Sequence, residues 1–124
     1  MRDTIKALKA LSDETRLRIL NILLERECCV CEVMQALDIS QSRASRNLAA
    51  LCDAGFLSQR KEGLWSLYSI DREGMQGYLN DLVRAVKRAT AGNSVMKLDK
   101  ARLATAERVG PGCVNRARRG CCSG

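Results

Sequence analysis

The chain has 124 residues, a formal net charge of +7, no histidine and few aromatic side chains. This length fits one domain, and the aliphatic composition favours a helical core. No apolar run approaches the about 18 residues of a membrane span, and no export signal is visible, so we expect a cytoplasmic protein without a membrane partner. The seven cysteines are odd in number, which indicates thiols or metal ligands rather than a disulfide framework.

Two helices are predicted in the first 25 residues. The first covers residues 3–11, and the apolar residues on one of its faces are Ile5, Leu8 and Leu11. Ser12 is the expected N-cap of the second helix, residues 13–25, whose wide apolar surface predicts a central position. The arginines at the margins of this helix are expected to be solvated charges: Arg16, Arg18 and Arg26.

A helix-turn-helix pattern follows over residues 30–55. A helix over 30–37 and a tight turn over 38–40 lead to a second helix over 41–54, which ends at Gly55. The second helix turns amides, hydroxyls and arginines outward, as insertion into a DNA groove requires. The candidate DNA contacts are Ser40, Gln41, Ser42, Arg43, Ser45, Arg46 and Asn47. A plain helical hairpin with a polar face is the alternative.

The next segment favours the DNA-binding interpretation. Short β-prone runs over 56–60 and 65–70 are joined by a glycine-containing loop. A basic hairpin after a recognition helix is typical of a wing, so Arg60 and Lys61 are expected to contact phosphates or the minor groove. Trp65 and Tyr68 are expected to pack the hairpin onto the helices. The predicted fold class is therefore mainly α with a small β-hairpin, a winged helix-turn-helix.

A terminal helix is predicted from about residue 71 to Gly92, with an apolar seam of coiled-coil type. We expect this seam to pair with a second copy, because winged helices of this size usually read DNA as two-fold dimers. The expected dimer contacts are Ile5, Leu8, Met75, Leu79, Leu82 and Val86. The predicted domains are 1–92 for DNA binding and dimerisation, and 93–124 as a basic, cysteine-containing, flexible tail with at most a weak helix over 95–109.

Three cysteines within four positions precede the helix-turn-helix: Cys28, Cys29 and Cys31. Crowded thiolates suit thiophilic ions. On a regular helix Cys29 and Cys31 lie about 200° apart, whereas Cys28 and Cys31 share a face. A site that uses both Cys29 and Cys31 therefore requires unwinding of the helix start, which would shift the DNA-reading unit behind it. Cys52 is expected to be a small core residue.

Four segments in this order resemble the ArsR/SmtB family of bacterial metal-sensing winged-helix repressors: residues 12–17, 27–33, 40–48 and 60–65. The second is similar to the motif Glu-Leu-Cys-Val-Cys-Asp-Leu of the arsenic-sensing branch, with Cys29 and Cys31 at the motif cysteines and Cys28 in place of the leucine. The resemblance implies a homodimer on double-stranded operator DNA that is released by As(III) or Sb(III), without an organic cofactor or enzymatic activity.

The sequence departs from this family in two respects. Met34 occupies the place of a third cysteine found in some members, and the absence of histidine argues against the family's zinc and nickel sites. The third sulfur is therefore expected from Cys28 or from the tail cysteines, Cys113, Cys121 and Cys122, which could also form a separate site of their own. The alternatives are a repressor switched by a disulfide, a Cd or Pb sensor of the same fold, and, more remotely, a dithiol oxidoreductase.

Overall fold

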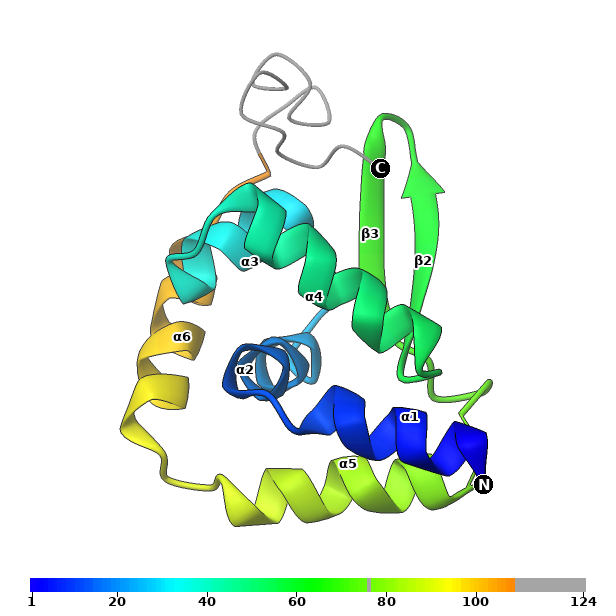
Figure 1. Ribbon diagram of the computed structural model, residues 1–124. Coiled ribbons are helices and arrows are strands. Elements are labelled where there is room, and N and C mark those ends of the chain that lie inside the picture. The colour runs from blue at the N-terminus through cyan, green and yellow to red at the C-terminus, as the bar shows by residue number, and fades with distance from the viewer. Residues whose placement is uncertain (76, 109–124) are drawn as a thin grey trace.

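The computed structural model describes residues 1–75 and 77–108, a mainly helical unit with a small antiparallel sheet (Figure 1). The helices are α1 (Arg2–Leu11), α2 (Glu14–Leu23), α3 (Val30–Leu37), α4 (Gln41–Asp53), α5 (Gly77–Ala89) and α6 (Ser94–Thr105). The strands are β1 (Cys28–Cys29), β2 (Leu57–Glu62) and β3 (Trp65–Ile70). The predicted class, helices with a β-hairpin after a helix-turn-helix, is confirmed. No helix within the described residues is both long and apolar enough to cross a membrane.

Helix α2 lies at the centre of the fold, as its wide apolar surface predicts (Figure 1). Ile19 and Ile22 are fully buried in the hydrophobic core. Helix α2 contacts each of the other five helices and strand β3. Its N-cap is Asp13 rather than the expected Ser12, because the Asp13 carboxylate accepts the Arg16 backbone N–H at 3.0 Å. The Ser12 hydroxyl instead donates to the Leu8 carbonyl at the end of α1.

The three arginines expected to be solvated are structural. Arg16 donates to the Ala10 carbonyl, and Arg26 pairs with the buried Glu32. Arg18 makes two hydrogen bonds of 2.8 Å to the carboxylate of Asp99 and a third of 3.1 Å to the Leu37 carbonyl. Their partners lie up to 81 positions away in the chain, so periodicity within α2 could not predict them.

The helix-turn-helix has the predicted bounds, α3 at Val30–Leu37 and α4 from Gln41. Asp38 takes a left-handed conformation with φ of 57°, which turns the chain sharply. The Ser40 hydroxyl accepts the Arg43 backbone N–H and caps α4, as expected. Gly55, with φ of 94°, follows the end of this helix in the conformation that glycine adopts most readily.

The sheet has the order β1-β3-β2, and its first strand was not predicted. Cys28 pairs with Tyr68 and Cys29 with Leu67, so the cysteine segment joins the outer side of the hairpin. Strand β2 runs to Glu62, beyond the predicted end at Arg60, and Gly63 with φ of 61° permits a two-residue connection. Tyr68 is buried and Trp65 half-buried against the core, which confirms the packing role expected for both.

Helix α6 packs against α2 and α3 as part of the folded unit. Asp99 and Leu103 are buried, and the side chain of Asn93 caps the helix. This differs from the predicted boundary at residue 92, because a helix judged weak from its own sequence is held by contacts with α2 and α3. The flexibility expected for the remainder of the tail, 109–124, concerns residues outside those described.

The residues expected to form the dimer seam divide into two groups. Met75 and Leu79 are buried in the core of the protomer, because α5 packs one face on its own domain. Leu82 is half-buried against the same core. Ile5 and Leu8 of α1, in contrast, are 45% and 48% exposed, since Ala7 and Ala10 form the face that packs inward.

Candidate DNA-binding surface and cysteine site

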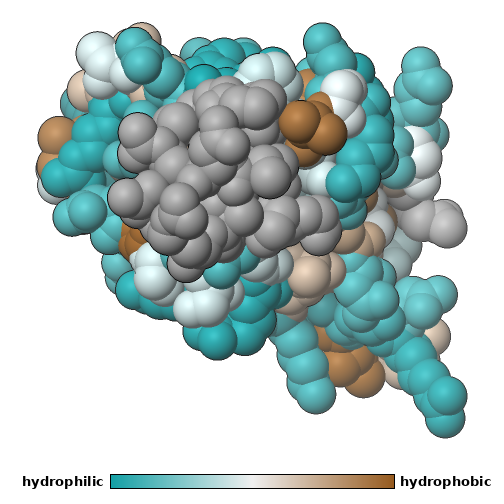
Figure 2. Space-filling model, turned by 90° about the horizontal axis from the view of Figure 1, so that it is seen from above, coloured by the Kyte–Doolittle hydropathy of each residue, from teal (hydrophilic) through white to brown (hydrophobic). Residues whose placement is uncertain are grey.

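Helix α4 carries a polar outer face next to the hairpin. Ser42, Arg43 and Arg46 are exposed, and Gln41 donates to the Ser45 hydroxyl at 2.7 Å on the same side. Seen from the side of α3, α4 and the hairpin tip, the visible surface of the described residues is predominantly hydrophilic (Figure 2). Amides, hydroxyls and guanidinium groups on such a face can reach base edges and phosphates.

Asn47 does not belong to this outer face, and the expectation that its side chain points outward is wrong. Its side chain is 7% exposed. The amide oxygen accepts from Arg16 at 3.1 Å, and the amide nitrogen donates to the Arg43 carbonyl at 2.9 Å. Asn47 therefore braces α4 against α2, because it lies three positions after Ala44 and four before Leu51 on the buried side of the helix.

Arg60 is engaged within the protein, whereas its neighbour Lys61 is exposed. The guanidinium group of Arg60 makes two hydrogen bonds of 2.8 and 2.7 Å to Glu27 and an ion pair of 2.8 Å with Glu62. The hydrogen bonds with Arg60 hold the pKa of Glu27 below its usual value. Of the two wing residues expected to contact DNA, Lys61 is thus the one whose charge is unpaired within the described structure.

Replacing Lys61 with alanine is expected to weaken DNA binding and to reduce its salt dependence. Loss of one phosphate contact should lower the slope of log K against log salt concentration by about 0.9 per protomer. Arg60→Ala should change this slope less, because the carboxylates of Glu27 and Glu62 already neutralise Arg60. Fluorescence anisotropy at several salt concentrations measures the slopes, with Lys97→Ala on the distant α6 as control. Equal slope losses in the Arg60 and Lys61 variants would show that both reach phosphate.

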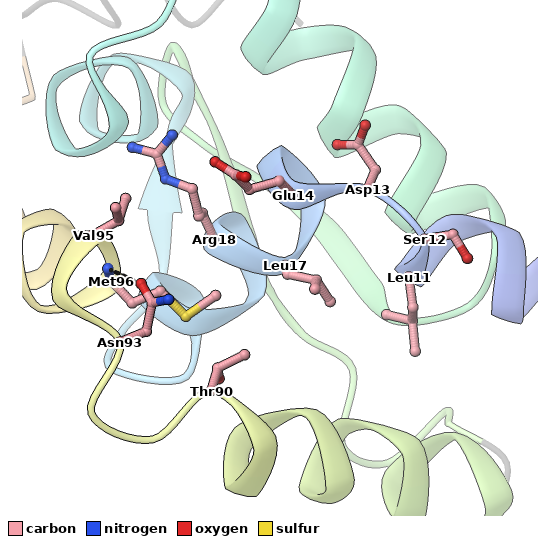
Figure 3. Close-up of a pocket in the computed structure, with 10 residues that line it drawn as sticks. All are labelled: Leu11, Ser12, Asp13, Glu14, Leu17, Arg18, Thr90, Asn93, Val95 and Met96. Carbon is pink, nitrogen blue, oxygen red and sulfur yellow. Dashed lines mark hydrogen bonds between the residues drawn. The ribbon is translucent and has the colours of Figure 1, made fainter.

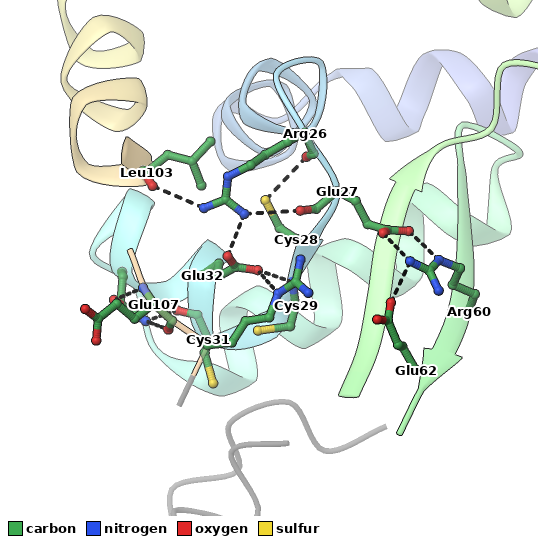
Figure 4. A network of polar contacts seen from close by, with 12 residues as sticks. Arg26, Glu27, Cys28, Cys29, Cys31, Glu32, Arg60, Glu62, Leu103 and Glu107 are labelled. Carbon is green, nitrogen blue, oxygen red and sulfur yellow. Dashed lines mark hydrogen bonds and ion pairs between the residues drawn. The ribbon is translucent and has the colours of Figure 1, made fainter. Parts of the chain in front are cut away.

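The cysteine segment forms the start of α3 (Figure 4). Cys29 is the N-cap of this helix and forms a capping box with Glu32, in which the Cys29 thiol faces the Glu32 backbone N–H. In return, the Glu32 carboxylate accepts the Cys29 backbone N–H at 2.9 Å. Because Cys29 precedes the helix, the angular separation expected for Cys29 and Cys31 on one regular helix does not apply to them.

Cys28 does not share a face with Cys31, contrary to the sequence-based expectation. Cys28 lies in strand β1, and its sulfur is turned toward the Arg26 carbonyl at 3.5 Å, away from Cys29 and Cys31 (Figure 4). Burial raises the pKa of the Cys28 thiol to about 12. Such a thiol is a poor source of thiolate, which weakens its candidacy as the third ligand.

No group of three or more Cys, Asp or Glu side chains that could hold a metal ion occurs among residues 1–75 and 77–108. The two motif cysteines, Cys29 and Cys31, both lie at the start of α3. The tail candidates Cys113, Cys121 and Cys122 lie outside the described residues. Cys52 is half-buried at the end of α4, where burial raises its pKa, as suits a packing residue.

Glu32 is a buried carboxylate next to these cysteines, and sequence reasoning did not predict its role. Its side chain is 3% exposed, and it pairs with both Arg26 and Arg108. Burial opposes its ionisation, but the hydrogen bonds from the Cys29 backbone and the two arginines lower its pKa. A Glu three positions after a cap residue is the sequence signal of a capping box, which could have identified this role.

A pocket of about 430 Å³ lies away from the cysteines, between the start of α2 and the turn before α6 (Figure 3). Its principal polar side chains already have structural partners. Asp13 and Asn93 cap α2 and α6, and Arg18 is bound to Asp99. We therefore assign no ligand to this pocket.

Comparison with known proteins identifies the family. The family described as "Bacterial regulatory protein, arsR family" matches residues 13–59. The chain is 48% identical over 67 residues to the arsenical resistance operon repressor of Escherichia coli, covering 53% of this chain and 57% of that protein. It is 37% identical over 84 residues to the arsenic resistance transcriptional regulator ArsR2 of Pseudomonas putida, covering 67% and 72%. The chain belongs to the arsR family.

This arsR-family chain is also similar to a cadmium-resistance regulator and to a solved winged helix-turn-helix structure. It is 44% identical over 72 residues to the cadmium resistance regulatory protein CadC homolog of Staphylococcus aureus, covering 57% of this chain and 60% of that protein. Among solved structures, the homodimeric winged helix-turn-helix domain Mb0332 of Mycobacterium bovis matches with a TM-score of 0.62 and 27% identity, covering 75% and 82%.

The chain spans between 52% and 60% of the first three curated relatives that it matches. The relatives and the fold are those of transcriptional regulators rather than enzymes. The family and the winged helix-turn-helix fold predicted from the sequence are therefore confirmed.

Proposed function

We propose that this protein is a homodimeric transcriptional repressor that releases its operator when trivalent arsenic or antimony binds Cys29 and Cys31. The observation that carries the proposal is that Cys29 has two roles at once. It corresponds to a motif cysteine of arsenic-sensing relatives, and it is also the N-cap of α3, the first helix of the helix-turn-helix. A ligand on this sulfur therefore acts directly on the element that positions α4.

Ligand capture opens the capping box. The Cys29 sulfur that coordinates an ion is withdrawn from the Glu32 backbone N–H, so the capping box loses one of its two contacts. Cys29 and Cys31 are 0% and 2% exposed, and in this proposal the start of α3 opens to admit the ion. Helix α3 has eight residues, and loss of its first turn displaces the turn that leads into α4.

The tail supplies the third sulfur in this proposal, since Cys28 is turned away. Arg108, the last described residue, is bound to Glu32 beside Cys29. Cys113 follows five positions later, a span of at most about 18 Å for an extended chain. The tail cysteines are thus within reach of the site on the same protomer, without a need for the partner.

The proposed dimer uses the exposed face of α1 and the outer side of α5. Ile5 and Leu8 present apolar surface that the protomer leaves open, and Leu82 and Val86 are half-buried at the margin. Two-fold pairing would set the two α4 helices against operator half-sites about 34 Å apart. The proposed DNA contact on the wing is Lys61. The proposed contacts on α4 and its N-cap are Ser40, Gln41, Ser42, Arg43, Ser45 and Arg46.

The proposal is tested by titrating a complex of the reduced, full-length protein and its promoter fragment with arsenite, with no oxidant present. We expect operator DNA to be released, with affinity reduced at least about tenfold, within the usual range of allosteric coupling. DNA affinity is measured by fluorescence anisotropy. Unchanged affinity in the presence of saturating arsenite would exclude the proposed function.

Parallel titrations separate the rival functions. Release by diamide or peroxide but not by arsenite would identify a disulfide switch, and release by Cd²⁺ or Pb²⁺ alone would identify a divalent-metal sensor. X-ray absorption of the arsenite complex gives the number of sulfur ligands. We expect three for the full-length protein and two for a chain ending at Gly110; three in both would exclude the tail as the source of the third sulfur.

A further inference from the structure

The chain after α6 lies across the start of α3, on the side of the cysteines (Figure 4). We call residues 106–108 the strap. Just before it, in the last turn of α6, the Leu103 carbonyl accepts from Arg26 at 3.2 Å. In its middle, the backbone of Glu107 makes two hydrogen bonds with the Gln35 side chain, of 2.8 and 3.1 Å. At its end, Arg108 donates to Glu32 at 3.0 Å.

Arg108 acts on the capping box of α3 through Glu32. The same carboxylate oxygen of Glu32, Oε1, accepts both the Cys29 backbone N–H and the Arg108 Nε–H. Glu32 is 3% exposed, and both Arg26 and Arg108 pair with its carboxylate. Without Arg108, the Cys29 backbone N–H can still donate to Glu32, but the carboxylate loses one of the two side chains that hold it in place.

We propose that Arg108 is a positioning residue that sets the inducer concentration at which operator DNA is released. The strap holds Glu32, Glu32 holds the closed start of α3, and this closed start withholds Cys29 and Cys31 from the ion. The inference rests on the proposed function, because it specifies how the same cysteine site is regulated.

The direction of the effect follows from linkage. The ion binds the open form of the α3 start, so every contact present only in the closed form raises the inducer concentration needed. DNA binding depends on the closed form, which remains dominant when one partly exposed arginine is removed. Loss of Arg108 should therefore shift the inducer response much more than it shifts operator affinity.

The test compares Arg108→Ala with Arg108→Lys in the full-length protein. In Arg108→Ala we expect the arsenite concentration for half-release to fall about fivefold, near the lower end of typical coupling effects. Operator affinity without arsenite should stay within about twofold. Arg108→Lys, which keeps a cation for Glu32, should restore most of the wild-type response. The matched control is Lys100→Ala, which removes a cation of α6 whose partner, Glu25, is exposed.

Hydrogen exchange of the backbone amides over residues 29–32 provides a measurement that does not depend on an inducer. We expect exchange to accelerate in Arg108→Ala and not in Lys100→Ala. This result supports the strap even if arsenite fails to release DNA from the wild-type protein and the proposed function fails. Unchanged exchange in Arg108→Ala, or equal shifts in operator affinity and inducer response, would overturn the inference.

Discussion

Replacing Asp99 with alanine is expected to destabilise the protein by about 3–5 kcal/mol, because it leaves the Arg18 guanidinium without its buried counter-ion. The Asp99 side chain is fully buried and that of Arg18 is 14% exposed. The hydrogen bonds with Asp99 raise the pKa of Arg18 above its usual value. Without Asp99 this increase is lost, but a guanidinium group is not deprotonated in proteins, so Arg18 stays charged. In thermal unfolding followed by circular dichroism, the midpoint should fall by more than about 10 °C for a domain of this size.

Two further variants test whether the buried ion pair is the cause. Lys100→Ala breaks an exposed ion pair between α6 and Glu25 and should cost less than about 1 kcal/mol. Replacing Arg18 and Asp99 together with leucine should recover much of the loss, since no unpaired buried charge remains. If Asp99→Ala were no more destabilising than Lys100→Ala, the attachment of α6 to the core would not depend on this ion pair.

The second large effect is expected at the sulfur site itself. Cys29→Ser and Cys31→Ser should each abolish release by arsenite, raising the concentration for half-release more than about 100-fold, near the upper range of typical coupling. Operator binding should persist in both. At position 29 serine is a preferred N-cap residue, so the substituted hydroxyl can still accept the Glu32 backbone N–H and keep α3 closed. Anisotropy of a labelled operator measures both properties.

Cys28→Ala tests whether the third cysteine of the segment is also a ligand. Because the Cys28 sulfur is turned toward the Arg26 carbonyl, we expect this variant to lose some stability and to retain release by arsenite. Cys52→Ser, at the far end of α4, should behave in the same way. Release that survives in both Cys29→Ser and Cys31→Ser would place the site elsewhere, and loss of release in a stably folded Cys28→Ala would make Cys28 a ligand.

The parts of the fold that the sequence predicted well are those with local signals. The bounds of α3 and the start of α4 follow from a capping serine and a short turn. Gly55 and Gly63 mark positions with positive φ, where a side chain would be strained. The polar outer face of α4 follows from helical periodicity, which assigns most of its residues correctly but cannot resolve a boundary position such as Asn47.

The parts that sequence reasoning missed depend on contacts between distant residues. Strand β1 has two residues, too few for a periodic signal, and exists because β3 offers it a partner. Arg18 and Asp99 are separated by 81 positions, and Glu32 and Arg108 by 76. A charged residue at a helix margin looks the same in sequence whether it is solvated or paired, so the attachment of α6 was not foreseen.

The pairing of Cys28 and Cys29 with β3 affects how the protein would dissociate from DNA. These two residues pair with β3 of the hairpin, and the chain continues directly from Cys29 into α3. In the proposed function, a displacement at the sulfur atoms would therefore move the hairpin and the helix-turn-helix together. Dissociation should accordingly be abrupt, with both grooves vacated together rather than one after the other.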